Sequence, residues 1–103
     1  MDCALVYQRV LAVANFFLKN ASHLTFDGLK ELNPTVDQIA KDLRTLAKLL
    51  KALASDDYDD ENMAINASQC CVVMERIARC VESNNEQELS ELLRSLEKHV
   101  SVP

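Results

Sequence analysis

The chain has 103 residues, a length that suits one domain with a single core. Hydrophobic residues make up 49% of it, and only one Gly and two Pro interrupt them, which excludes a disordered chain and a turn-rich all-β domain. The formal net charge of −5 argues against a general nucleic-acid binder and against anionic membrane surfaces, because both need positive charge. We therefore expect residues 1–103 to form a single helical-bundle domain.

The first predicted helix covers residues 2–20 and leaves only a thin polar strip. Gln8, Asn15 and Lys19 lie within about 40° of one another on a helical wheel, because steps of seven and eleven residues return to one face. Nearly all other residues from 4 to 18 are apolar. Such a helix is central to its core or has a second buried face. It is too short and too interrupted for a membrane span, which needs roughly 20 apolar residues.

Residues 21–34 interrupt the helical pattern. Thr25 can cap one or two extra helical turns near residues 25–32. The side chains expected to face inward from this segment are Phe26, Leu29 and Leu32. The segment ends at Asn33-Pro34, because the residue before a proline avoids the α region.

The second long helix begins at one of two signals. Thr35 and Gln38 match a capping box, and Asn33 followed by Pro34 at the first helical position is the alternative. Its apolar residues recur at intervals of three and four, which is typical of a bundle seam. They are Val36, Ile39, Leu43, Leu46, Leu50 and Leu53.

An acidic loop over residues 55–61 precedes the third long helix, which we predict at 60–82. The expected seam of this helix is Met63, Ala67, Cys70, Met74, Ile77 and Val81. Further apolar residues lie off that seam, at Ile65, Val72, Val73 and Cys80. Like the first helix, the third therefore carries apolar surface beyond a single stripe.

The last predicted helix covers residues 86–100, with Asn85 and Glu88 as its N-terminal capping signal. Its expected buried residues are Leu89, Leu92, Leu93, Leu96 and Val100. Three connections are short, which favours antiparallel neighbours. The sequence thus predicts an all-α fold, an antiparallel four-helix bundle with a short extra helical turn near 25–32.

The residues that could act in catalysis or bind a ligand do not form a recognisable motif, so we expect no enzyme, no cofactor and no metal. The cysteines at positions 3, 70, 71 and 80 have neither disulfide-framework nor zinc spacing, and we expect core thiols at 70 and 71. With no signal peptide apparent, we expect an intracellular, cytoplasmic protein, with the nucleus as an alternative. A phosphorelay role would require a mid-helix histidine, whereas His23 and His99 lie in a connection and at a helix end.

The surplus of apolar residues on the first and third long helices is the main functional indication. The irregular segment at 25–32 covers the surplus in one interpretation; in the other, a face remains for a partner chain. The second long helix adds a basic row of Lys41, Arg44, Lys48 and Lys51, either a solvated face or a positive rim beside an apolar groove. The candidate partner-binding residues are Leu5, Val6, Phe16, Phe17, Val72 and Val73, with Lys48 and Lys51 as the rim.

We therefore predict a non-enzymatic protein–protein interaction module, an adaptor or scaffold subunit, that docks a partner's amphipathic helix on the first and third helices. The first alternative is an obligate homo-oligomer or a structural subunit of a complex. A phosphorelay-type or other small helical enzyme component is a second, weaker alternative. The expected partner is another protein or a second copy of the chain, with no nucleic acid and no membrane span.

Overall fold

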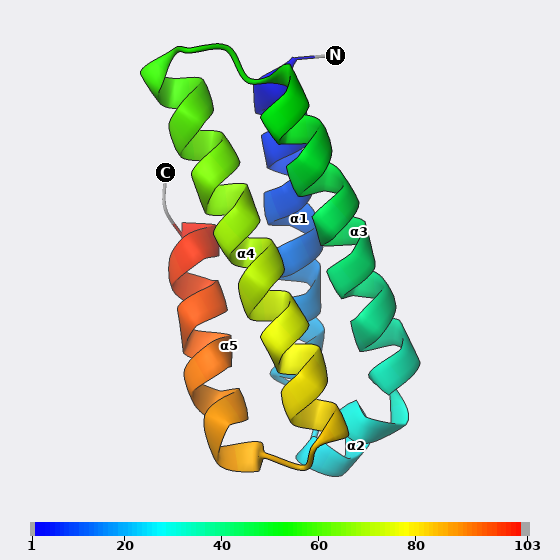
Figure 1. The fold of residues 1–103 in the computed structure, drawn as a ribbon. Helices are drawn as coiled ribbons and strands as arrows, with labels where there is room; N and C mark the ends of the chain where they lie inside the picture. The colour runs from blue at the N-terminus through cyan, green and yellow to red at the C-terminus, as the bar shows by residue number, and fades with distance from the viewer. Residues whose placement is uncertain (1, 102–103) are drawn as a thin grey trace.

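A computed structural model describes residues 2–101, which form four long helices and one short helix (Figure 1). The helices are α1 (Cys3–Ala21), α2 (Phe26–Glu31), α3 (Asn33–Leu53), α4 (Tyr58–Glu82) and α5 (Glu86–Ser101). There is no strand among the described residues. The all-α antiparallel bundle with a short extra helix is confirmed.

Local capping explains where three of these helices begin. The Asp2 carboxylate accepts a hydrogen bond from the Leu5 amide at 2.9 Å, and the Thr25 hydroxyl accepts one from the Gly28 amide at 3.1 Å. The Asn85 side chain accepts from the Glu88 amide at 3.3 Å and donates to the Glu88 carboxylate at 3.0 Å. These contacts satisfy amides that have no partner inside a helix, and they confirm the predicted caps at Thr25 and Asn85.

Of the two starts considered for α3, the structure follows the signal at Asn33-Pro34: α3 begins at Asn33, directly after Leu32, the C-cap of α2. The capping box of Thr35 and Gln38 therefore lies inside the helix and does not form. Pro34 lies in its first turn, where the missing amide hydrogen leaves no intrahelical bond unmade. Helix α4 begins at Tyr58, two residues before the predicted 60, because Asp57 caps it through the Asp59 amide. Leu32 is exposed rather than facing inward.

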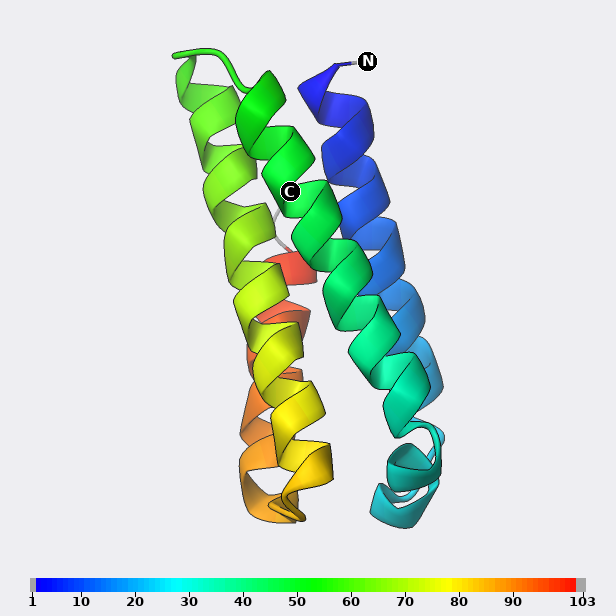
Figure 2. The same cartoon turned by 45° about the vertical axis from the view of Figure 1, so that its right-hand side comes forward.

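The four long helices surround one core, and α2 closes the end where α1 connects to α3 (Figures 1 and 2). Helices α1 and α4 contact each other across the centre, and each also contacts both α3 and α5. This arrangement explains the wide apolar surfaces of α1 and α4, because each packs against three long neighbours. Helix α5 is shorter than α4 and ends partway along it (Figure 1).

The core contains the predicted seam residues together with residues that the seams left out. The fully buried large side chains are Val10, Val36, Leu43, Leu50, Cys70, Met74, Ile77, Val81 and Leu96. Val73 and Cys80, which lie off the α4 seam, are also buried, on the side of α4 that faces α5. Ile65 and Val72, also off the seam, remain exposed.

Candidate functional site

Large apolar side chains remain exposed on three sides of the bundle. Helix α1 presents Leu5 and Phe16, which are 59% and 66% exposed. Helix α4 presents Tyr58, Ile65 and Val72, which are 75%, 55% and 54% exposed and which we call the α4 stripe. Partly exposed leucines lie beside α2 and near the end of α3.

The α4 stripe runs along the outer face of its helix. Its members recur every seven residues, so they stay on one side of the helix with a drift of only about 20° per repeat. The polar residues between them, Glu61, Ser68 and Gln69, are exposed as well. This face therefore combines spaced apolar anchors with small or polar neighbours.

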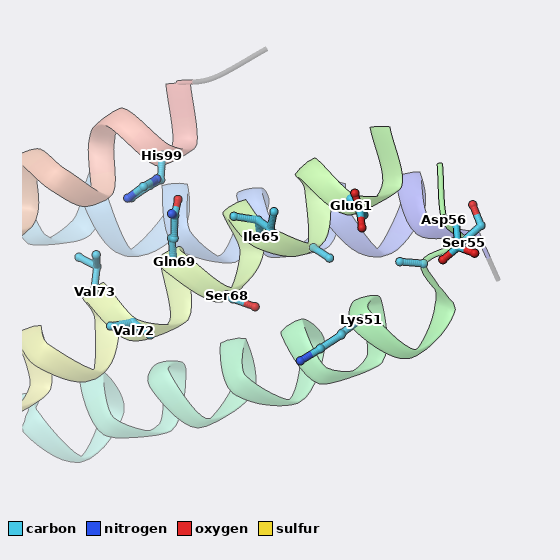
Figure 3. Close-up of a pocket in the computed structure, with 12 residues that line it drawn as sticks. Lys51, Ser55, Asp56, Glu61, Ile65, Ser68, Gln69, Val72, Val73 and His99 are labelled. Atoms are coloured by element: carbon cyan, nitrogen blue, oxygen red, sulfur yellow. The ribbon is translucent and has the colours of Figure 1, made fainter. Parts of the chain in front are cut away.

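A shallow groove of about 670 Å³ lies over this face, between α3 and α5. Figure 3 shows Lys51 on α3, beside the part of α4 that carries Ile65, Ser68 and Val72, with His99 on the α5 side. The residues that line the groove are Lys51, Ala54, Ser55, Asp56, Glu61, Ala64, Ile65, Ser68, Gln69, Val72, Val73 and His99.

Among the apolar residues predicted to bind a partner, some are exposed and others are in the core. Leu5, Phe16 and Val72 are exposed, as a docking residue must be. For Val6 and Phe17, 3% and 4% exposed, the structure corrects the expectation, because both pack into the core. Val73 is 8% exposed and contributes to the floor of the groove.

The exposed residues of α1 and α4 do not share one face of the molecule. Helices α1 and α4 face each other through the core and have α3 and α5 on either side. Their outward faces consequently point in opposite directions. Leu5 and Phe16 therefore belong to one surface, and Ile65 and Val72 belong to another.

The basic row of α3 lies on the side that faces α4. Arg44 donates from Nε to Glu75 Oε1 at 2.8 Å, and its Nη2 lies 2.6 Å from the same oxygen. Lys41 pairs with Asp37 at 3.1 Å. Lys48 and Lys51 are exposed and form no ion pair within residues 2–101. These two lysines remain available to a partner.

Glu75 anchors the α3–α4 contact as an ionised carboxylate. Partial burial alone would raise its pKa, but hydrogen bonds from Arg44 and Cys71 and the charges of Arg44 and Arg79 outweigh that effect and lower it. The pair at Arg44 is half-exposed, so its energetic contribution is modest. The pair links the exposed edges of α3 and α4 beside their apolar contact.

Acidic residues are concentrated in the connection before α4 and in its first turn. The acidic segment, as we call it, comprises Asp56, Asp57, Asp59, Asp60 and Glu61. Hydrogen bonds from the backbone and hydroxyl of Ser55, at 3.1 and 2.9 Å, lower the pKa of Asp60. Asp56 and Glu61 line one end of the groove. The groove therefore has an acidic end and a lysine beside its middle.

Sequence reasoning missed a polar cluster that joins three helices. The Asn66 side-chain nitrogen donates to the Tyr7 hydroxyl at 2.7 Å and to the His99 carbonyl at 2.9 Å. The Asn66 amide oxygen lies 3.0 Å from Nδ1 of the His99 ring. Because a carbonyl only accepts, this orientation of the amide places a proton on Nδ1 of His99. The only signal in the sequence was that Asn66 is a polar residue next to small residues of the α4 seam.

The cysteines are unsuited to nucleophilic chemistry. All four are free and buried. Burial raises the pKa of Cys70 to about 11, and burial together with the Glu75 carboxylate raises that of Cys71 to about 11. Near neutral pH both thiols are protonated, and the thiolate is the reactive form.

The described residues contain no group of three or more His, Cys, Asp or Glu side chains placed to hold a metal ion. No helix within residues 2–101 has the length and apolar character needed to cross a membrane. Comparison of the chain with models of protein families, with curated proteins and with solved structures found no match.

Proposed function

We propose that this chain is a non-enzymatic protein–protein interaction module that docks an amphipathic helix along the outer face of α4. The observation that carries the proposal is the exposure of Ile65 and Val72, each more than half accessible beside the groove. Exposed apolar side chains rimmed by polar residues mark interaction surfaces. Anchors one heptad apart match the spacing by which one helix contacts another.

Charged residues around the groove support a defined orientation of the docked helix. Lys51 lies beside its middle, with Lys48 one turn away, whereas Asp56 and Glu61 lie at its end. Charges at the rim of an interface contribute more to specificity and to association rate than to affinity. A helix with basic residues at one end and acidic residues at the other fits this pattern.

The test is a capture experiment followed by direct binding. The tagged chain is compared with an Ile65→Asp/Val72→Asp variant and with a Leu5→Asp/Phe16→Asp control, which changes the opposite face. The amphipathic helix of a captured protein is then synthesised and titrated against each purified variant. We expect the α4 variant to bind it at least tenfold more weakly, a difference of about 1.4 kcal/mol, and the control to bind it normally.

Amide chemical shifts provide the second readout. In the wild-type chain, the titrated peptide should perturb the amides of Lys51, Ile65 and Val72. The proposal is contradicted by a folded α4 variant that retains every captured protein. It is also contradicted by a wild-type chain that neither captures a protein nor associates with itself.

A further inference from the structure

The outward face of α1 and its N-cap carries exposed residues at the spacing of a coiled-coil seam. Successive members are three, four, three, four and three residues apart, which keeps them within an arc of about 100°. The core residues Val10 and Phe17 lie on the other side of the helix. Figure 2 shows α1, in blue, along one edge of the bundle. The exposed residues, which we call the α1 seam, are Asp2, Leu5, Arg9, Ala12, Phe16 and Lys19.

The spacing of the α1 seam is the same in both directions. A second α1 that runs antiparallel to the first therefore places every seam residue opposite another seam residue. Leu5 and Phe16, which are 59% and 66% exposed, then lie opposite each other. The long side chain of Arg9 lies opposite the small Ala12. The antiparallel pairing thus joins apolar with apolar and large with small.

We infer that the α1 seam is an interface between two copies of the chain. The copies are related by a twofold axis in the plane of contact, which crosses α1 at right angles midway between Arg9 and Ala12. In a twofold interface, if one residue contacts a second, then the second contacts the first in the other copy. The reversible spacing of the seam meets that requirement, whereas a different partner would not need it.

The charges of α1 also favour a second copy. Arg9 and Lys19 are the only charged residues from 3 to 21, and neither they nor Asp2 form an ion pair within residues 2–101. In the antiparallel dimer, Lys19 of each copy lies opposite Asp2 of the other, so two equivalent attractive contacts form. A parallel dimer would instead place Arg9 opposite Arg9, where like charges repel.

The acidic segment supports the same orientation. The connection between α3 and α4 lies at the end of the bundle where α1 begins (Figure 1), and Asp60 is close enough to Cys3 to raise the pKa of that thiol. An antiparallel dimer keeps the two acidic segments at opposite ends. At physiological ionic strength, charges more than about 8 Å apart are largely screened. The net charge of −5 on each copy therefore opposes this contact only weakly.

The extent of the α1 seam sets the strength of the dimer. Each copy contributes two large exposed apolar side chains, Leu5 and Phe16. This places the interface at the small end of the specific range, below about 1,200 Å². We therefore expect a reversible dimer that dissociates on dilution.

Sedimentation velocity from about 1 mM to about 1 µM protein tests the association. We expect the wild-type chain to dimerise at the upper concentrations and Leu5→Asp/Phe16→Asp to raise the dimer dissociation constant at least tenfold. Circular dichroism verifies that each variant retains the helical fold. A wild-type chain that is monomeric at every concentration overturns the inference, and so does a dimer that is insensitive to the α1 substitutions.

Matched substitutions of Ala12 test the pairing with Arg9. Arginine and glutamate are both good helix formers, and position 12 is exposed, so the fold tolerates either. Ala12→Arg places a second guanidinium group opposite Arg9 of the other copy, whereas Ala12→Glu places a carboxylate there. We expect Ala12→Arg to dimerise at least tenfold more weakly than Ala12→Glu. Equal dissociation constants would show that position 12 does not face Arg9 and would overturn the antiparallel register.

Disulfide trapping gives an independent measure of the register. Under mild oxidation a mixture of Leu5→Cys and Phe16→Cys should cross-link, because their Cβ atoms lie within about 4.5 Å. Neither variant alone should do so, since equal positions are about 16 Å apart along the antiparallel helices. The wild-type chain, whose native thiols are buried, is the control. Cross-linking by Leu5→Cys alone, or none in the mixture, overturns the inference.

The inference and the proposed function concern opposite faces of the bundle, so each can fail without the other. Ile65→Asp/Val72→Asp should dimerise as the wild-type chain does, even where it has lost the captured helix. Loss of dimerisation in that folded variant would place the contact on α4 and overturn the inference. The monomeric Leu5→Asp/Phe16→Asp variant should in turn still bind the captured helix.

Discussion

At the scale of single residues, the buried thiols make the free energy of unfolding depend on pH. Cys70 and Cys71 both have a pKa near 11, raised by burial and, for Cys71, additionally by Glu75. An exposed thiol in the unfolded chain has a pKa of about 8.5. Between these values the unfolded chain binds fewer protons than the folded chain, so the free energy of unfolding falls as the pH rises. Below pH 8 both states hold the protons and the effect vanishes.

We predict that the chain loses stability between pH 8.5 and 10.5. The slope contributed by each thiol is at most about 1.4 kcal/mol per pH unit. Urea unfolding at a series of pH values measures it. The control, Cys70→Ala/Cys71→Ala, should be less stable at pH 7.5 because it creates cavities, yet show a shallower alkaline slope. Identical slopes in the two proteins would contradict this assignment.

At the scale of the helices, Asn66 connects elements that are otherwise held by apolar packing. Its side chain contacts Tyr7 on α1 and both the carbonyl and the ring of His99 on α5. Helix α5 is the shortest of the four long helices and ends close to this cluster. The hydrogen bonds therefore fasten the end of α5 to α4 and α1.

Asn66→Ala should lower the free energy of unfolding by about 2 kcal/mol, because each hydrogen bond contributes roughly 1 kcal/mol and the partners are left partly buried. Tyr7→Phe removes only the hydroxyl and should lose about half as much. Chemical denaturation gives both values, and hydrogen exchange should show faster opening of the last turns of α5 in Asn66→Ala. Values within 0.5 kcal/mol of the wild-type chain for both variants would show that the cluster is energetically unimportant.

At the scale of the whole molecule, the positions of α1 and α4 decide which apolar residues are exposed. Each of these helices contacts three long neighbours, so most of its apolar circumference is buried. Phe16 and Phe17 illustrate the result: adjacent in sequence and identical in chemistry, they are 66% and 4% exposed. Phe17 is therefore a packing residue, and Phe16 lies on the outward face of α1.

The matched substitutions Phe17→Ala and Phe16→Ala test this arrangement. We expect Phe17→Ala to lower the free energy of unfolding by about 3–5 kcal/mol, because it leaves a cavity in the core. Phe16→Ala should change it by less than about 0.5 kcal/mol. Thermal and urea denaturation of the two variants give the comparison. Losses of similar size would mean that Phe16 is also part of the core.

The helices themselves were predictable from the sequence, because the signals that define them are local. The spacing of Val36, Leu43 and Leu50 identifies α3, and the caps at Thr25 and Asn85 place the starts of α2 and α5. Local signals left a helix boundary open where two of them competed. At the start of α3 both the capping box at Thr35 and the Asn33-Pro34 signal were available, and the helix begins at Asn33, with only Leu32 between it and the end of α2 at Glu31.

The candidate site was predictable only in part. The sequence identified α1 and α4 as carrying surplus apolar surface, and it singled out Val72 and Lys51, which lie at the groove. It could not separate Phe16 from Phe17 or Val72 from Val73, because periodicity gives relative angles on one helix and not the positions of its neighbours. Asn66 and His99 are 33 residues apart, so no local pattern joins them. Sequence alone determined the helices through local hydrogen bonding and periodicity; only tertiary packing decided which apolar residues became core and which remained exposed.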